Sequence, residues 1–231
     1  MLCLLNVQTN AIAACTDALV SSASYASGES IPYILTAQSR QPKYAVVLMP
    51  GSSGRLEPEM RDGKLHHLAA TNFLIRSRKL FCDNEFIAIS TDSTGSPERM
   101  LAIIRDVEAK FGKIKTYVIG TSKSTYSTIQ LSEPLDAQVA GFIHTSSMNS
   151  IVSFDPRAFK SRHLIVHHKE DICKSTLLTS AEWAHKRYDA ELLIVEGGIS
   201  VGDQCGPSAH HGYNGIEKET VDKIKAWIKK K

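Results

Sequence analysis

The sequence predicts an α/β protein with a mostly parallel central sheet and helices on both faces. Short, continuous apolar runs rich in β-branched residues recur along the chain, as in strands that are covered on both faces. Patterns with helical spacing lie between these runs. The chain has 231 residues, of which 42% are hydrophobic and 22% charged. These values fit one ordinary globular domain, which we expect to span residues 15–231.

The apolar runs define the expected strands, which are 44–49, 85–90, 116–120, 139–144, 163–167 and 191–195, with 32–37 as a candidate edge strand. The expected helices are 96–112, 123–132, 174–188 and 215–230. The first of them begins with a Ser96 cap and Pro97, and it ends at Gly112. In parallel sheets, functional side chains gather at the carboxyl ends of the strands. The residues that follow each run are therefore the ones to examine.

Residues 1–14 are a candidate remnant of an export signal. The segment starts with an apolar stretch, and Ala11-Ile12-Ala13 fits a signal cleavage site. The run that ends at Cys15 also resembles a bacterial lipobox, in which Cys15 would carry a lipid anchor. We therefore expect a periplasmic or secreted protein. The alternative is an ordinary N-terminal segment of a cytoplasmic protein.

Composition and charge narrow the classes of partner that we expect for this protein. The formal net charge is +3, and the chain has no basic stripe with interleaved aromatic residues, so we expect no nucleic-acid partner. No stretch approaches the roughly 20 apolar residues of a membrane span.

The stretch "IGTSKST" at 119–125 follows an expected strand and allows two interpretations. A phosphate-binding loop requires glycine directly before Lys123 and another at the position of Tyr117, and both are missing. A nucleotide-binding module is therefore disfavoured. The other interpretation is a nucleophile elbow, G-x-S-x-G, which presents a serine on a tight strand-to-helix turn. Ser122 holds the nucleophile position, and Ser124 stands where the pattern has its second glycine.

A catalytic serine needs a base and an acid that orients the base. In hydrolases with a nucleophile elbow, the acid and then the histidine follow the serine along the chain. Here Glu170 and Asp171 come just after an expected strand, and His210 and His211 lie on the loop before the last helix. All three roles therefore fall at strand ends in the required order.

These residues resemble a family of small, cap-less bacterial α/β-hydrolases. The matching stretches, which lie between residues 44 and 231, are "VVLMPGSSGRL", "NFLIRSRKLF", "VIGTSKST", "VHHKEDIC" and "CGPSAHHGYNGIEKETVDKIKAWI". The resemblance implies a three-layer α/β-hydrolase fold without a cap domain. It also implies that Ser122 is the nucleophile, Asp171 the acid and His211 the base.

Two choices within this assignment stay open. His211 is preferred over His210 because Gly212 beside it frees the loop to turn toward the serine, and the resemblance favours Asp171 over Glu170. The three His-His pairs do not predict a metal site, because adjacent histidines point apart on an extended backbone and the sequence has no C-x-x-C spacing. We expect neither a metal nor another cofactor.

The developing oxyanion needs two N–H donors. One is expected from Lys123, which follows the nucleophile, and the other from the loop "PGSSG" after the strand at 44–49. Ser52 is the preferred donor and Ser53 the second choice. Gly51 and Gly54 permit the unusual backbone angles of such a loop.

Asp92 follows another strand end. It is a candidate to support the oxyanion loop or to bind substrate, and a helix cap is the alternative.

Cys173 lies two residues after Asp171, and Cys205 lies six residues before His211. If both loops converge on Ser122, a Cys173–Cys205 disulfide would tie the acid loop to the base loop. Such a bond fits an exported protein, because disulfides persist in oxidising compartments. Cys82 is then expected to be a buried free thiol.

The sequence therefore predicts a serine hydrolase that cleaves a carboxylic ester or thioester of a small acyl substrate through an acyl-enzyme. The site is expected to be open, and peptide bonds remain a further substrate class. The alternative is a non-catalytic binding or scaffold protein that keeps the fold, and the replaced glycine at Ser124 is its main support.

Overall fold

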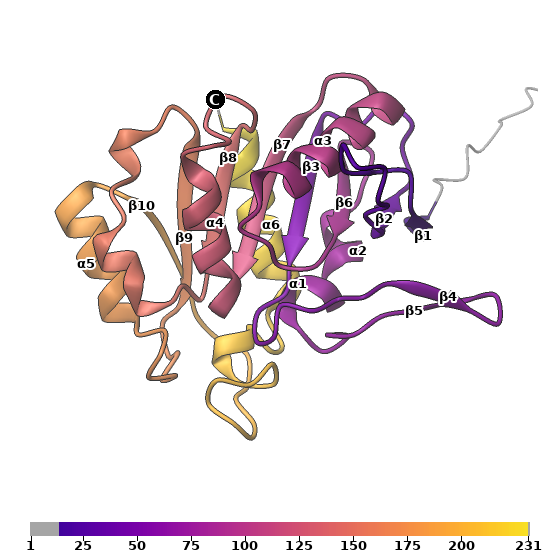
Figure 1. Cartoon of the computed structure of the whole chain (residues 1–231). Helices are drawn as coiled ribbons and strands as arrows, with labels where there is room; N and C mark the ends of the chain where they lie inside the picture. The colour runs from indigo at the N-terminus through magenta and orange to yellow at the C-terminus, as the bar shows by residue number, and fades with distance from the viewer. Residues whose placement is uncertain (1–13, 231) are drawn as a thin grey trace, which may run out of the picture.

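The computed structural model describes residues 14–230 (Figure 1). The candidate export signal at 1–14 lies outside the described residues, except for its last residue. Within 14–230, no helix is both long enough and apolar enough to cross a membrane.

Among the described residues, eight strands form the central sheet in the order β1-β2-β6-β3-β7-β8-β9-β10. Their bounds are β1 Thr16–Val20, β2 Tyr33–Ala37, β3 Tyr44–Met49, β6 Phe86–Ser90, β7 Lys115–Thr121, β8 Gly141–Thr145, β9 Arg162–His168 and β10 Glu191–Val195. The pairs β1–β2 and β2–β6 are antiparallel, and every other neighbouring pair is parallel. The predicted mostly parallel sheet is therefore confirmed.

The prediction that 32–37 forms an edge strand is wrong. This segment forms β2, and β1 lies outside it at the edge of the sheet. The sequence of β1 is "TDALV", and its side chains are exposed or half-buried. Because β1 is polar and lies at the edge, it lacks the continuous apolar run by which the inner strands were recognised.

The helices cover both faces of the sheet (Figure 1). Their bounds are α1 Phe73–Arg76, α2 Arg78–Phe81, α3 Pro97–Phe111, α4 Thr125–Ser132, α5 Leu178–Tyr188 and α6 Glu217–Lys229. Successive side chains of β3 point to opposite faces of the sheet and so contact the two helical layers. Val46 and Leu48 pack with residues of α1, α2 and α6, whereas Val47 packs with residues of α3 and α4. This is the predicted three-layer arrangement.

The helix expected at 174–188 begins later, at Leu178. The side chain of Thr176 bonds to Asp171, and the N–H of Leu177 donates to Asn149 Oδ1 at 2.7 Å. These two contacts, to the preceding acid loop and to the segment after β8, hold the residues before α5 as a loop.

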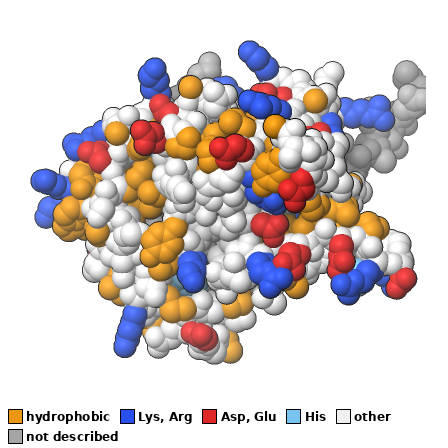
Figure 2. Space-filling view, in the orientation of Figure 1, with side chains coloured by type: hydrophobic (Ala, Val, Ile, Leu, Met, Phe, Trp, Pro, Cys, Tyr) orange, Lys and Arg blue, Asp and Glu red, His pale blue; other side chains and the backbone are white. Residues whose placement is uncertain are grey.

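A two-stranded hairpin, β4 Glu59–Arg61 and β5 Lys64–His66, projects from the body of the molecule (Figure 1). Between β8 and β9 the chain forms two short 3-10 helices, Asn149–Ser153 and Pro156–Ala158, and no cap domain lies in this described segment. The face shown in Figure 2 carries interspersed positive and negative side chains around a shallow hollow.

Candidate active site

Ser122 lies on a sharp turn between β7 and α4. The strand ends at Thr121, a 3-10 turn spans Ser122–Ser124, and α4 follows at once. The φ angle of Ser122 is +52°, a left-handed conformation that is uncommon for residues other than glycine. A Cβ on Gly120 would lie 2.6 Å from the carbonyl oxygen of Ser124, so the first glycine of the motif is required by the close approach of backbone. The turn therefore has the strained geometry of a nucleophile elbow.

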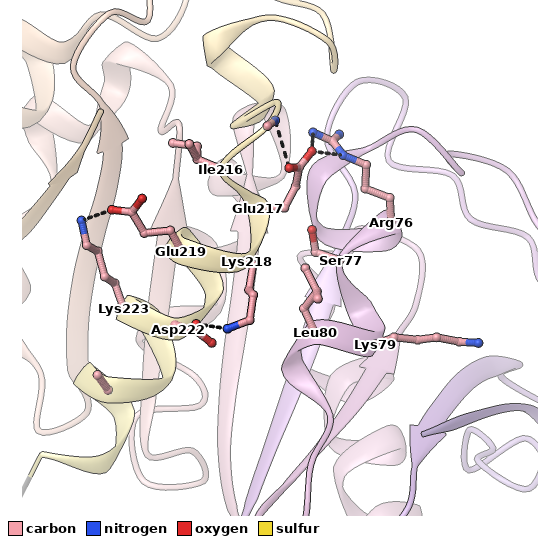
Figure 3. A pocket seen from close by; sticks show the side chains of 12 residues that line it. Arg76, Ser77, Lys79, Leu80, Ile216, Glu217, Lys218, Glu219, Asp222 and Lys223 are labelled. Carbon is pink, nitrogen blue, oxygen red and sulfur yellow. Dashed lines mark hydrogen bonds and ion pairs between the residues drawn. The ribbon is translucent and has the colours of Figure 1, made fainter. Parts of the chain in front are cut away.

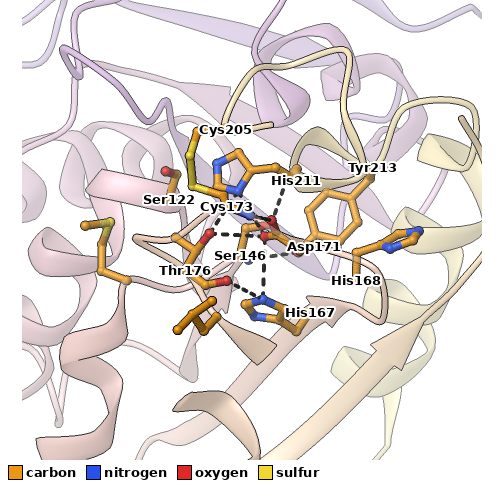
Figure 4. Close-up of polar contacts among 12 residues, drawn as sticks. Ser122, Ser146, His167, His168, Asp171, Cys173, Thr176, Cys205, His211 and Tyr213 are labelled. Atoms are coloured by element: carbon orange, nitrogen blue, oxygen red, sulfur yellow. Dashed lines mark hydrogen bonds and ion pairs between the residues drawn. A yellow bond between two sulfur atoms is a disulfide. The ribbon is translucent and has the colours of Figure 1, made fainter. Parts of the chain in front are cut away.

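Asp171 and His211 form a buried hydrogen-bonded pair. His211 Nδ1 lies 3.0 Å from Asp171 Oδ2, and the Asp171 side chain is fully buried. The other carboxylate oxygen accepts a bond of 2.9 Å from the N–H of Cys173, and Thr176 Oγ1 donates to Oδ2 at 3.1 Å. These bonds fix the carboxylate so that it orients the imidazole (Figure 4).

His167 lies on the other side of Asp171 from His211 (Figure 4). Its Nε2 is 2.8 Å from the carbonyl oxygen of Thr176 and 3.5 Å from Asp171 Oδ2. Burial lowers the pKa of His167, so near neutral pH this ring is uncharged and its Nε2–H donates to Thr176.

The backbone around His211 is anchored to the sheet. Ser146 Oγ donates to the carbonyl oxygen of His211 at 2.7 Å. The buried Tyr213 hydroxyl accepts from the N–H of Ser146 at 2.8 Å and donates to the carbonyl oxygen of Val166 at 2.9 Å. Burial raises the pKa of Tyr213, which keeps the phenol neutral and able to donate.

A third anchor for this loop is Arg76 of α1, whose Nη2 donates to the carbonyl oxygen of Gly212 at 2.6 Å. Its Nε bonds Glu217 Oε1 at the start of α6 at 3.0 Å (Figure 3). Arg76 is one of the lining residues of a groove of about 940 Å³ between α2 and α6. Ser122, Asp171 and His211 do not line that groove.

The structure separates the adjacent candidates that the sequence left open. His210 turns away from Asp171 and stacks on His168, with ring centroids 4.4 Å apart and an interplanar angle of 4°. Glu170 is exposed and lies 3.9 Å from His210 Nε2, whereas Asp171 is buried against His211. The chosen pair, Asp171 and His211, is therefore the one in hydrogen-bond contact.

His168, Glu170 and His210 bring possible ligand atoms within 4.8 Å of one another. The two imidazoles are stacked and nearly parallel, so their in-plane lone pairs do not converge on one point. Both nitrogens of His168 are also engaged, one with the N–H of Glu170 and the other with the carbonyl oxygen of Gly197. A metal ion would have to disrupt this arrangement. The second group, Asp171, Cys173 and His211, contains a sulfur that is already in a disulfide.

The loop after β3 packs directly against the elbow. Ser52 has a φ of +57°, and the N–H of Gly54 closes the turn by donating to the carbonyl oxygen of Gly51 at 3.0 Å. A Cβ on Gly51 would lie 2.7 Å from the carbonyl oxygen of Thr121 and 3.1 Å from Ser122 Cβ. Glycine at position 51 thus allows the loop to approach the candidate nucleophile.

Asp92 is not among the residues that line the pocket at Ser122. Its Oδ1 accepts from the N–H groups of Leu56 and Glu57 at 2.6 and 3.1 Å, and its Oδ2 pairs with Arg99 at 3.1 Å. The cap of α3 is Ser96. Asp92 therefore holds the segment that follows the "PGSSG" loop.

One pocket of about 670 Å³ brings most of the predicted residues together. Its lining includes Gly51, Ser52, Ser53, Ser122, Lys123 and His211. Met148 and the two cysteines of the predicted disulfide also contribute to its walls. Among residues 14–230, no hydrogen bond joins Ser122 Oγ to His211, and such bonds are often long in ligand-free sites.

Two disulfides occur among the described residues. Cys173 and Cys205 are bonded, as the sequence predicts, and link the loop after Asp171 to the loop before His211 (Figure 4). The second joins Cys15 to Cys82. The expectation of a free thiol at Cys82 is therefore wrong, and so is the lipid anchor at Cys15, because its sulfur is already bonded. The interpretation of Cys15 as a lipobox cysteine left no place for its pairing with a residue 67 positions away.

The sequence does not identify Thr176, Ser146 and Tyr213 as site residues. They are buried polar residues whose only local signal is their place near strand ends, and their partners on the loop of His211 or on β9 lie far away in the sequence. From the sequence, Arg76 is expected near the same region as Asp92, to bind a substrate carboxylate or, more commonly, to form a structural ion pair; the structure shows an ion pair with Glu217.

No protein-family profile and no curated protein matches this sequence. Comparison with solved structures gives many matches. A dienelactone hydrolase from Anabaena variabilis is 11% identical, with a TM-score of 0.63 over 93% of this chain and 97% of that chain. A cold-adapted esterase from an Arctic intertidal metagenomic library is 12% identical, with a TM-score of 0.60 over 92% and 94%.

A third similar structure is a lidless α/β serine hydrolase from Xanthomonas campestris, which is 9% identical, with a TM-score of 0.56 over 90% of this chain and 94% of that chain. At these identities the likeness defines the fold. The chain has the three-layer α/β-hydrolase fold, and the resemblance predicted from its sequence is confirmed at that level.

Proposed function

We propose that this protein is a serine hydrolase that cleaves a carboxylic ester or thioester of a small acyl substrate. The observation that carries the proposal is the strained Ser122, which shares one pocket with His211 while His211 is bonded to buried Asp171. Structural likeness to hydrolases supports it.

In the proposed reaction, Ser122 Oγ attacks the acyl carbonyl carbon while His211 Nε2 takes the hydroxyl proton. Asp171 keeps Nδ1 protonated and stabilises the imidazolium. The carbonyl oxygen becomes an oxyanion that accepts from the N–H groups of Lys123 and Ser52. Collapse of the intermediate breaks the bond to the leaving group, which takes the proton from His211.

Water then completes the cycle. It attacks the acyl-Ser122 ester, gives one proton to His211, and releases the carboxylic acid as the serine hydroxyl is restored. Within residues 14–230, the short segment between β8 and β9 adds no cap over the pocket, so acyl groups of accessible substrates can reach Ser122. The two disulfides support a place in an oxidising compartment, the periplasm or the cell exterior.

The test is the intact mass of the protein after treatment with a fluorophosphonate. Attack by Ser122 expels fluoride and leaves one phosphonyl group on its oxygen. We expect one label on the wild type, none on Ser122→Ala, and undiminished labelling of Ser175→Ala, which removes another serine of the same pocket. A folded wild type that takes no label would contradict the proposal and favour the non-catalytic scaffold.

A further inference from the structure

Ser124 replaces the second glycine of the elbow pattern, and its side chain makes hydrogen bonds with the backbone. It is 2% exposed, and its backbone lies in the right-handed helical region, with φ −73° and ψ −4°. Because that conformation suits any residue, the position does not need glycine for its backbone. The Ser124 side chain points inward, to the place where β3 and β7 end.

The Ser124 hydroxyl has three backbone partners. It accepts from the N–H of Thr121 at 2.7 Å, and its single hydrogen faces the carbonyl oxygens of Met49 and Thr121, each at 2.9 Å. Met49 and Gly120 form the last registered pair between β3 and β7. The hydroxyl thus continues the link between the two strands beyond the point where their ladder ends.

The partners of Ser124 are the residues that carry the candidate chemistry. Thr121 directly precedes Ser122, and Met49 is followed by Pro50 and the Gly51 loop. Gly51 packs against the same Thr121 carbonyl oxygen, with space for no Cβ. One buried hydroxyl therefore sits between the nucleophile turn and the loop that offers the second oxyanion donor.

We propose that Ser124 is a positioning residue that locks the Ser122 turn to the oxyanion loop through its side-chain hydroxyl. The inference rests on the proposed hydrolase function. The left-handed φ of Ser122 is a strained conformation that its surroundings must impose, and the Ser124 bonds act on the residue next to it. The departure from the glycine pattern then supports catalysis and does not indicate a scaffold.

The experiment compares Ser124→Ala and Ser124→Gly with Ser132→Ala. Ser132 is also buried in α4, and its hydroxyl donates to the carbonyl oxygen of Thr128, so it controls for the loss of a buried hydroxyl. The readouts are the rate constant for fluorophosphonate labelling, kcat and KM for p-nitrophenyl acetate, and hydrogen exchange of the Thr121 amide.

We expect both Ser124 variants to lose about tenfold or more in labelling rate and kcat, with KM changed less than about threefold, because a misplaced oxyanion donor acts on the transition state. Ser132→Ala should stay within about twofold of the wild type on the same measures. The Thr121 amide should exchange faster in both Ser124 variants and keep its wild-type protection in Ser132→Ala.

Equal kcat in the wild type and both folded Ser124 variants would overturn the proposal. So would an equal loss in Ser132→Ala, which would show a general effect of stability. If Ser124→Ala does not fold, Ser124→Gly carries the comparison, because glycine is the residue of the pattern itself. If the wild type reacts with neither probe, the proposed hydrolase function is refuted. Independently of activity, an unchanged exchange rate of the Thr121 amide in the Ser124 variants would refute the link through the Ser124 hydroxyl.

Discussion

Removal of the Cys173–Cys205 disulfide tests whether the acid and base loops act as one unit. The perturbation is the double variant Cys173→Ala/Cys205→Ala, and its control is Cys15→Ala/Cys82→Ala. The first bond closes a separation of 32 residues and the second one of 67. In the chain-entropy relation, both lengths give a stabilisation of about 4 kcal/mol, and they differ by less than about 1 kcal/mol.

The two double variants should therefore lose similar stability but differ in activity. Cys173 lies two residues after Asp171 and donates its backbone N–H to that carboxylate, and both cysteines of this bond line the Ser122 pocket. Cys15 precedes β1 at the far edge of the sheet (Figure 1). We expect the labelling rate with fluorophosphonate to fall about tenfold or more in Cys173→Ala/Cys205→Ala, because small misplacements are costly in catalysis.

Urea denaturation measures the free energy of unfolding of both variants, and intact mass measures the labelling rate under conditions where both are folded. Wild-type labelling in Cys173→Ala/Cys205→Ala would refute the idea that this bond positions the site. A loss as large in Cys15→Ala/Cys82→Ala would show that lowered stability alone accounts for the effect.

Three further predictions concern pH, the His211 loop and the elbow. Burial lowers the pKa of His163 from 6.5 to about 4. The neutral ring therefore contributes about 3 kcal/mol to the free energy of unfolding above pH 6.5, and this stability is lost as the pH falls toward 4. Urea denaturation across this range should show the decrease in the wild type and a smaller decrease in His163→Phe. Arg76→Lys should lower the labelling rate severalfold by releasing the Gly212 carbonyl, whereas Arg78→Lys, which weakens an ion pair to β1, should lower only the melting temperature. Gly51→Ala places a Cβ against backbone at 2.7 Å, and we expect it to abolish most labelling while circular dichroism stays that of the wild type; unchanged labelling would refute the close packing of loop and elbow.

The inner strands could be predicted from sequence because each is buried on both faces and reads as a continuous apolar run. The hairpin β4–β5 has a signal in the sequence, which lies at its turn. Its turn is Asp62-Gly63, with positive φ at both residues, the pairing that two-residue hairpins favour. Its strands have three residues each and are mostly exposed, so no hydrophobic alternation marks them.

The rules about strand ends and chain order place Ser122, the pair Glu170-Asp171 and the pair His210-His211 at one edge of the sheet. The choice of Asp171 within its pair came from the resemblance, and that of His211 from the neighbouring Gly212. The supporting contacts follow no such rule. Thr176 bonds Asp171 within the acid loop, but it approaches His211 Nδ1 at 3.1 Å only because the acid and base loops converge in space. Ser146 reaches His211 across 65 residues of sequence. Such partners are chosen by tertiary packing, which spacing along the chain does not encode.

Ser124 shows how a departure from a motif can be read physically. Glycine is required in a motif where a Cβ would collide or where φ must be positive. Gly120 and Gly51 meet the first condition, since an added Cβ would lie within 2.7 Å of backbone at both. Position 124 meets neither, because its φ is −73° and its side chain has room for a hydroxyl with three partners. The glycines that this site cannot replace are therefore Gly120, which lets β7 turn tightly into α4, and Gly51, which lets the loop after β3 touch that turn. The replaced position is where a polar side chain can hold the turn and the loop together.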